Sequence, residues 1–405
     1  MSGSDRRAFL AQSVGALTGI ALLPDLVDAA PRRLRAPARV GLIGAGRQGR
    51  AILAELAKMD QVTVAAVCDV VPARVRIAVE RAPGSTGVAH HREVLERADV
   101  QAVFVATPTH LHRAIVADAL ATGKHVYCEA PLAHSADDAA AIAAAAAGAG
   151  PGTLCQAGFL ARSNPIYKRA KPLVGSELRG LVSLYGQHHR KTSWRFPAPE
   201  GVAGRVANWR LDPEATIGLA GEIGSHQLDA MTWLIDAMPA RVRGRGGIRV
   251  HRDGRAVADT IQLDLEWADG VAMQYEATLG NSFGGEYEAL HGTNAALKLA
   301  GTHGWMFKEA DAPTQGWEVY ATRQQFHQDE GIVLVADATR LAAQGRLQQG
   351  AGLPHPPLYY GLSDFLLSVT QGAPVACSAA DGLRSTLLGV AADRSVRSGE
   401  VVTLP

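Results

Sequence analysis

Short apolar runs alternate with amphipathic segments through the first third of the chain. The runs lie at 40–43, 62–69, 100–106, 124–130 and 152–158. Because they are short, flanked by turn residues and mostly free of polar alternation, they predict strands buried on both faces. The segments between them predict helices, including one over 109–123 that ends at Gly123 and one that begins after Ser135. This alternation predicts a parallel, doubly wound sheet with its ligand beyond the carboxyl ends of the strands.

The pattern changes at about residue 159, where most of the helical segments disappear. Alternating runs then predict strands at 178–190, 240–250, 259–279 and 286–301. Asp269-Gly270 separates two such runs and predicts a hairpin. The expected second domain is therefore an α+β domain with a large, mostly antiparallel open sheet that has one free face.

The end of the chain completes this second domain. Residues 308–330 are polar and irregular, and we expect a loop or an insertion there. Two helices are expected over 358–372 and 379–399, and a short strand over 400–405.

The first 30 residues resemble a twin-arginine signal peptide. Arg6 and Arg7 precede an apolar run at 14–23 that is too short to span a membrane, and small residues follow at 27–30. The resemblance implies export of the folded protein to the periplasm, with no stable membrane insertion after cleavage. A tightly bound cofactor, loaded before export, would suit such a protein.

Composition narrows the classes of function. The net charge is +1 and aromatic residues make up 5%, which does not favour binding of nucleic acid. The four cysteines form no CxxC pair and have no zinc-site spacing with histidine, so no metal site is expected. The expected ligand is a small molecule.

The turn after the first predicted strand, 40–43, has the pattern of a dinucleotide-binding loop. Gly44, Gly46 and Gly49 follow a strand and open a helix, with Arg47 and Gln48 between them. Such glycines permit a tight turn and close approach of the backbone to a pyrophosphate. Asp69 ends the second strand, where a carboxylate binds the ribose hydroxyls and favours NAD. Arg74 lies nearby, so NADP stays open.

Four motifs together resemble the glucose–fructose oxidoreductase / inositol dehydrogenase (Gfo/Idh/MocA) family. They are "GLIGAGRQG", "VCDV", "ATPTHLHRAIVADALATGKHVYCEAPLA" and "GEIGSHQLD". The resemblance implies an NAD(P)-binding Rossmann domain over 36–157 and a substrate and oligomerisation domain over 158–405, whose free sheet face packs against a second copy. It also implies hydride transfer to or from a sugar, polyol or related carbonyl.

The resemblance also assigns cofactor contacts. It places Thr107, Pro108 and His112 near the nicotinamide half of the cofactor and Glu129 at the nicotinamide ribose. The region of Gln156 would close over the ring.

One helical segment carries candidate acid–base chemistry. Glu222, His226 and Asp229 are spaced to share one helix face. Oxidation of an alcohol requires a base for the hydroxyl proton, and histidine titrates near neutral pH. The resemblance places His226 beside the reacting carbon, with Glu222 where relatives have aspartate, and we expect Asp229 to be structural.

Weaker candidates could line the substrate pocket. Arg162, Trp209 and Arg210 have side chains that suit a polyol. His188 and His189 lie on a strand, so only one of them can face the cleft. Of these two, His189 is the candidate.

The resemblance also breaks down at position 130. Most relatives have Glu-Lys-Pro, whose lysine contacts both substrate and ribose, whereas this chain has Ala130 between Glu129 and Pro131. Three functions stay open: an NAD(P)-dependent oxidoreductase, a redox-neutral NAD-dependent glycoside hydrolase, and a non-catalytic ligand-binding protein.

Overall fold

The structure is a computed structural model that describes residues 34–197, 201–309, 312–313, 322–326, 329–334 and 353–404. The expected signal peptide over 1–30 lies outside the described residues. No helix in the described ranges is long and apolar enough to cross a membrane.

The first domain contains a parallel sheet of six strands in the order β3-β2-β1-β4-β5-β6. This confirms the doubly wound arrangement that the alternating pattern predicts. The strands are β1 Ala38–Ile43, β2 Val62–Cys68, β3 Thr86–Val88, β4 Ala102–Val105, β5 His125–Cys128 and β6 Cys155–Ala157. The connecting helices are α2 Arg47–Leu56, α3 Pro72–Arg81, α4 His91–Leu95, α5 His112–Ala121 and α6 Ala136–Ala147.

The second domain contains a sheet of ten strands in the order β14-β15-β13-β12-β11-β7-β10-β9-β8-β16. Only the β7–β10 pair among the described strands of this sheet is parallel, which confirms a mostly antiparallel sheet. Its first strands are β7 Leu181–His189, β8 Arg241–Gly247, β9 Thr260–Glu266, β10 Ala272–Thr278 and β11 Glu286–Gly292. The rest are β12 Ala295–Ala300, β13 His303–Lys308, β14 Thr322–Phe326, β15 Asp329–Leu334 and β16 Val401–Thr403.

Part of the segment expected to be a loop is a hairpin. Residues 322–326 and 329–334 pair with each other, and β15 also pairs with β13. The sequences TRQQF and DEGIVL have little apolar alternation, so the pattern does not predict these strands. Of the two, β14 is the edge strand of the sheet. Of the two alternatives for 308–330, a loop or an insertion, the loop is wrong for residues 322–326 and 329–330, which lie in strands.

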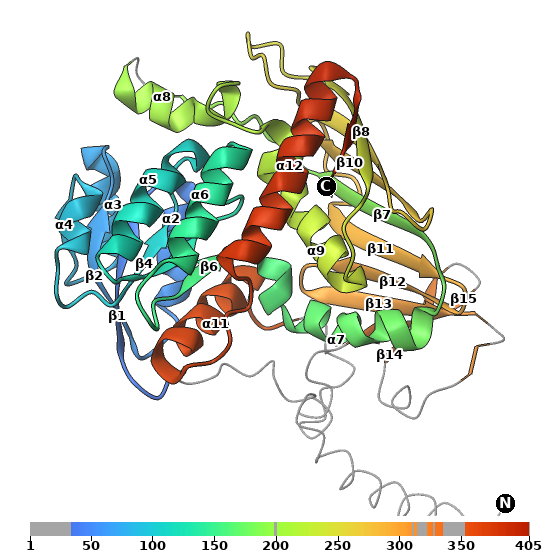
Figure 1. The fold of residues 1–405 in the computed structure, drawn as a ribbon, viewed down its shortest axis with the longest axis horizontal. Helices are drawn as coiled ribbons and strands as arrows, with labels where there is room; N and C mark the ends of the chain where they lie inside the picture. The colour runs from blue at the N-terminus through green and yellow to red at the C-terminus, as the bar shows by residue number, and fades with distance from the viewer. Residues whose placement is uncertain are drawn as a thin grey trace, which may run out of the picture.

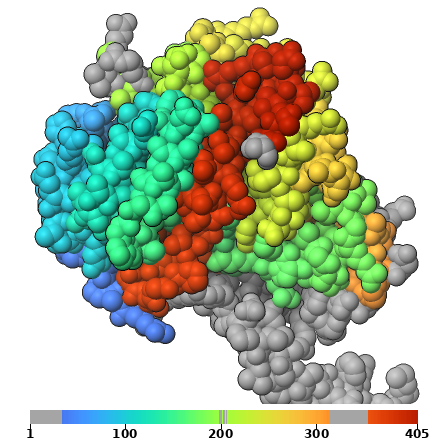
Figure 2. Space-filling view, in the orientation of Figure 1, coloured from blue at the N-terminus to red at the C-terminus, as the bar shows by residue number. Residues whose placement is uncertain are grey.

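Helices cover one face of the large sheet. They are α7 Pro165–Leu173, the π-helical turn η6 Ala220–Gly224, α9 Ser225–Ile235 and the long α12 Ala379–Ser398. Figure 1 shows α12 running between the two sheets, and the space-filling view in Figure 2 shows it as a continuous band between the first domain and the second. Helix α8 Val202–Asn208 lies at the top of the same view.

The core of the first domain includes a helix from the end of the chain. Helix α11, Pro357–Gln371, packs on α2 and buries Leu362, Phe365 and Leu366. The Phe365 ring lies 5.5 Å from that of Phe104 and 5.8 Å from that of Tyr127, both in the first sheet. The segment 36–157 therefore supplies the strands of this domain but not its whole core.

Candidate active site

The glycine turn after β1 is shaped by backbone contacts. Gly44 has φ +97°, and a Cβ there would lie 2.5 Å from the carbonyl oxygen of Ala106. A Cβ on Gly49 would lie 1.9 Å from the carbonyl oxygen of Gly44. A Cβ on Gly46 would meet only a nitrogen of Arg74, at 3.9 Å. The turn therefore leaves open space above the amino end of α2, where N–H groups and the helix dipole attract a pyrophosphate.

Asp69 lies at the carboxyl end of β2, beside this turn. Its carboxylate accepts hydrogen bonds from the N–H of Ala45 at 2.9 Å and of Val71 at 2.8 Å. Arg74 lies 3.9 Å from the same carboxylate. An acidic group here fits the ribose of NAD and repels a 2′-phosphate. The turn and Asp69 together fit a dinucleotide.

Glu129 is buried at the carboxyl end of β5. Gln48 donates a hydrogen bond to it at 3.0 Å, so the helix that follows the glycine turn contacts this carboxyl group. Burial raises the pKa of Glu129 to about 7, although Gln48, the N–H of Ala130 and the charge of Arg210 act in the opposite direction. Burial also lowers the pKa of Arg47.

His112 connects the loops that follow β4 and β5. Its Nε2 lies 3.0 Å from the carbonyl oxygen of Thr107, and its Nδ1 lies 3.2 Å from those of Pro131 and Leu132. Burial lowers the pKa of His112 to about 4. The ring contacts both loops and is neutral near pH 7, so it presents no charge to a cofactor.

Gln156, at the same edge, is buried in β6. Its Nε2 donates to the carbonyl of Gly361 in α11 at 3.2 Å, while its Oε1 has no hydrogen-bond partner in the described part of the chain. The side-chain amide of Gln156 is thus held through Nε2 by α11, and its Oε1 can accept a further hydrogen bond.

Glu222 joins the second domain to the cofactor edge. It accepts from the hydroxyl of Thr109, which follows β4, at 3.1 Å, and from that of Thr216 at 3.2 Å. The Nε of Arg210 lies 3.6 Å away. Burial raises the pKa of Glu222, and the Arg210 charge and the two hydroxyl groups oppose that rise.

His226 is half-buried at the start of α9. Its ring centroid lies 5.6 Å from that of Phe159, just past the end of β6. Burial lowers the pKa of His226, against the attraction of Glu286 and Asp229. No hydrogen bond joins Glu222 to His226 in the described residues, so Glu222 does not orient the imidazole directly. A neutral imidazole at pH 7 suits a general base.

Of the two adjacent histidines on β7, His188 is the one that the structure places near His226. His188 Nδ1 lies 3.2 Å from the Glu286 carboxylate, and both groups influence the pKa of His226. His189 points to the other face of the sheet, 2.8 Å from Glu276. The choice of His189 as the pocket residue is corrected by this placement, because successive strand residues face opposite ways. Glu286 was missed, since one glutamate at a strand start carries no sequence signal.

Arg162 is committed to an internal ion pair. It donates to Asp229 at 2.8 Å and lies 3.1 Å from Asp381 in α12. Ser385 donates to the same Asp229 carboxylate at 2.5 Å. These contacts correct the expectation that Arg162 binds substrate, because its guanidinium is buried and already paired. They agree with a structural role for Asp229.

Arg210 and Trp209 lie together beside Glu222. The Arg210 guanidinium lies 4.4 Å from the centroid of the Trp209 ring and 5.7 Å from that of Trp194. The Trp209 ring also lies 6.2 Å from that of His110. Both candidates therefore lie close to Glu222 and to the segment after β4.

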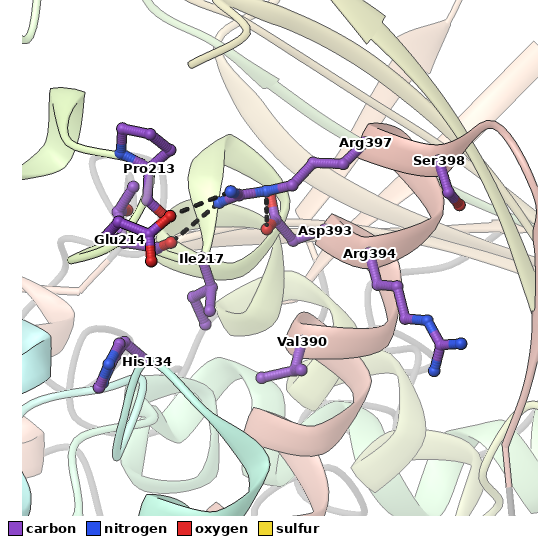
Figure 3. A pocket seen from close by; sticks show the side chains of 10 residues that line it. His134, Pro213, Glu214, Ile217, Val390, Asp393, Arg394, Arg397 and Ser398 are labelled. Carbon is purple, nitrogen blue, oxygen red and sulfur yellow. Dashed lines mark hydrogen bonds and ion pairs between the residues drawn. The ribbon is translucent and has the colours of Figure 1, made fainter. Parts of the chain in front are cut away.

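A hollow of about 570 Å³ lies behind the loop over 213–217. Figure 3 shows Arg397 donating hydrogen bonds to Asp393 and to the carbonyl of Pro213. Arg394 and His134 also line this hollow. Thr216 lines this hollow but gives its hydroxyl hydrogen to Glu222. The hollow is open and lacks His226 and the glycine turn, so it is not the candidate active site.

Two family models match this chain. Residues 38–155 match the oxidoreductase family with an NAD-binding Rossmann fold, GFO_IDH_MocA. Residues 185–404 match the C-terminal alpha/beta domain of the same family. Together they cover more than half of the chain.

Relatives and solved structures agree with these matches. The inositol 2-dehydrogenase of Arthrobacter sp. (strain FB24) is 31% identical over 250 residues, 61% of this chain and 69% of that protein. That of Acidothermus cellulolyticus is 26% identical over 90% of this chain and 94% of its own length. A levoglucosan dehydrogenase in complex with NADH and levoglucosan has a TM-score of 0.72 at 20% identity, covering 91% of this chain and 100% of that one. An oxidoreductase domain protein from Kribbella flavida has a TM-score of 0.73 at 23% identity, over 91% and 100%.

Proposed function

Because the chain belongs to the Gfo/Idh/MocA family of NAD-dependent oxidoreductases, we propose that it oxidises or reduces one carbon of a sugar or polyol, with His226 as the acid–base group. The observation that carries this proposal is the contact of the second domain with the cofactor edge. Glu222 accepts from Thr109, and His226 lies against Phe159, so an ionisable pair stands at the carboxyl ends of β4 and β6.

Each residue of the site has its own role in cofactor binding or proton transfer. Bound NAD supplies the hydride acceptor. The amides near Gly46 and the Arg47 charge would hold its phosphates, and Asp69 would hold the adenosine ribose. Glu129, which accepts a hydrogen bond from Gln48, would contact the nicotinamide ribose. His226 takes the hydroxyl proton as the carbon is oxidised and returns it in the reverse direction.

A redox-neutral glycoside hydrolase is the second candidate. Cleavage by oxidation, elimination of the aglycone, addition of water to the resulting double bond and re-reduction of the carbonyl needs a second base for the acidified C–H beside the new carbonyl. The His188–Glu286 pair lies near His226 and offers one. Ala130 also removes the residue on which simple dehydrogenases of this family rely. Tight retention of NAD would serve this cycle.

The proposal also includes where the enzyme acts and its oligomeric state. Arg6, Arg7 and the apolar run after them support export by the twin-arginine route to the periplasm. The free face of the ten-stranded sheet supports a homo-oligomer.

A single assay separates the two reactions. Protein purified without added nucleotide is tested for bound NAD by its absorbance, then mixed with myo-inositol, levoglucosan and a panel of aryl glycosides, with and without NAD. NADH that accumulates only with added NAD supports the dehydrogenase. Release of the aryl group without net NADH supports the hydrolase. Failure to bind NAD or NADH would contradict both.

A further inference from the structure

Position 130 leaves the site without the cation of the usual motif. Ala130 is part of an apolar cluster and has no polar side-chain atom. Its neighbour Glu129 and Glu222 of the second domain are both buried carboxyl groups, and the charge of Arg210 acts on both. Buried acids are costly to ionise unless a positive charge lies nearby.

Arg210 is the cation that the structure brings to these acids. Its Nε lies 3.6 Å from Glu222, and its charge favours the ionised forms of both Glu222 and Glu129. Its Cζ lies 4.4 Å from the centroid of the Trp209 ring, and this cation–π contact helps to hold the guanidinium beside Glu222.

One nitrogen of the Arg210 guanidinium, Nε, also lacks a hydrogen bond among the described residues. Its Nε is buried and has no hydrogen-bond partner in the described part of the chain, since 3.6 Å is too long for one. A buried donor without a partner is unfavourable in the free protein and becomes favourable when a ligand oxygen arrives. The unpaired Nε therefore points to a bound group that carries an oxygen acceptor.

We propose that Arg210 takes over the role of the missing lysine and donates a hydrogen bond to the reacting oxygen of the substrate. This rests on the proposed function. As the C–H bond breaks, its electron pair passes to NAD, the O–H proton passes to His226, and a C=O bond forms. Arg210 stabilises the negative charge that develops on the oxygen. Because arginine does not lose its proton near neutral pH, it takes no part in the proton relay, unlike a lysine.

The first test needs no substrate. In nucleotide-free protein, the pKa of the Glu222 carboxyl is followed by infrared difference spectroscopy, with Glu222→Gln to assign the band. Arg210→Ala should raise this pKa, and adding Ala130→Lys to that variant should lower it again. An unchanged pKa in Arg210→Ala, or no reversal by the lysine, overturns the proposal even if no substrate is ever found.

The second test uses the fastest sugar from the panel assay. Arg210→Ala should lower kcat about 100-fold, the usual effect of removing one oxyanion donor, and leave the Kd for NAD within about twofold. The double variant Arg210→Ala/Ala130→Lys should regain at least about tenfold and show a second ionisation in its pH profile. Arg394→Ala, on the far side of the 213–217 loop, is the control and should keep full activity.

The outcomes distinguish the two proposals. Wild-type turnover with an unaffected Arg210→Ala variant overturns the role of Arg210 alone. Absence of wild-type turnover with every sugar and glycoside contradicts the proposed function, while the infrared result still decides whether Arg210 supplies the missing charge.

Discussion

His188 and His189 are adjacent, yet the structure places only His188 near His226. The His188 charge lowers the pKa of His226 and that of Glu286 raises it. Oxidation needs neutral His226, so activity should rise as pH passes its pKa. His188→Ala should therefore move the acidic limb of kcat/KM to higher pH, and Glu286→Gln should move it to lower pH, in profiles measured from about pH 5 to 9.

His189→Ala is the matched control for this prediction. Its side chain contacts Glu276 and the carbonyl of Phe283 on the other face, so the acidic limb should stay in place. Equal shifts in His188→Ala and His189→Ala would contradict the assignment of faces.

At the residue scale, the sequence predicts the site residues that a short local motif identifies. Gly44, Gly49 and Asp69 are recognisable because a turn and a strand end demand particular residues at fixed spacing. Arg162 and Glu286 could not be assigned in this way. Their roles depend on partners 67 and 98 residues away, Asp229 and His188, which only the folded chain brings close.

At the element scale, strand β11 contains a buried acid that should make stability depend on pH. Burial raises the pKa of Glu288 to about 8, although Tyr167 donates a hydrogen bond to it. A folded-state pKa above the unfolded value means that protonation stabilises the fold. The free energy of unfolding should therefore fall as pH rises from about 4.5 to 8 and then level off.

Glu288→Gln should remove this dependence. The variant keeps an acceptor for Tyr167 but cannot ionise, so its Tm should exceed that of the wild type by several degrees at pH 9 and match it at pH 4.5. Glu276→Gln, on the other face of the sheet, serves as the control. A difference between Glu288→Gln and wild type that is the same at both pH values would contradict the raised pKa.

Helix α11 belongs to the core of the first domain, although about 200 residues of chain separate it from β6. Phe365 is fully buried against Phe104 and Tyr127. Phe365→Ala should cost about 3–5 kcal/mol, measured by urea unfolding, and residues 34–158 alone should lack a cooperative transition. Cooperative unfolding of that fragment would show that α11 is dispensable.

At the scale of the whole molecule, periodicity predicts both sheets but not how they are joined. The long apolar runs fix the parallel sheet, and the alternating runs fix most of the antiparallel one. The passage of α12 between the domains, the edge hairpin β14–β15 and the parallel β7–β10 pair follow from long-range packing, which has no local signature.

The outer face of the large sheet offers the surface for the proposed homo-oligomer. Tyr185 and Tyr287 lie together at its centre, with ring centroids 5.7 Å apart. The Nζ of Lys298 lies 4.1 Å from the centroid of the Tyr287 ring. Aromatic residues at the centre of a polar face are typical of interfaces.

If two copies meet at this face, charge at its centre should separate them. The wild type should show a multiple of the 42.6 kDa chain mass by light scattering, less any cleaved signal peptide. Tyr185→Glu/Tyr287→Glu should show the mass of one chain with an unchanged circular dichroism spectrum, because burying two carboxylates without partners is costly. Ile77→Glu, on exposed α3, should leave the mass unchanged. A monomeric wild type, or a double variant that still associates, would show that this face is not the interface.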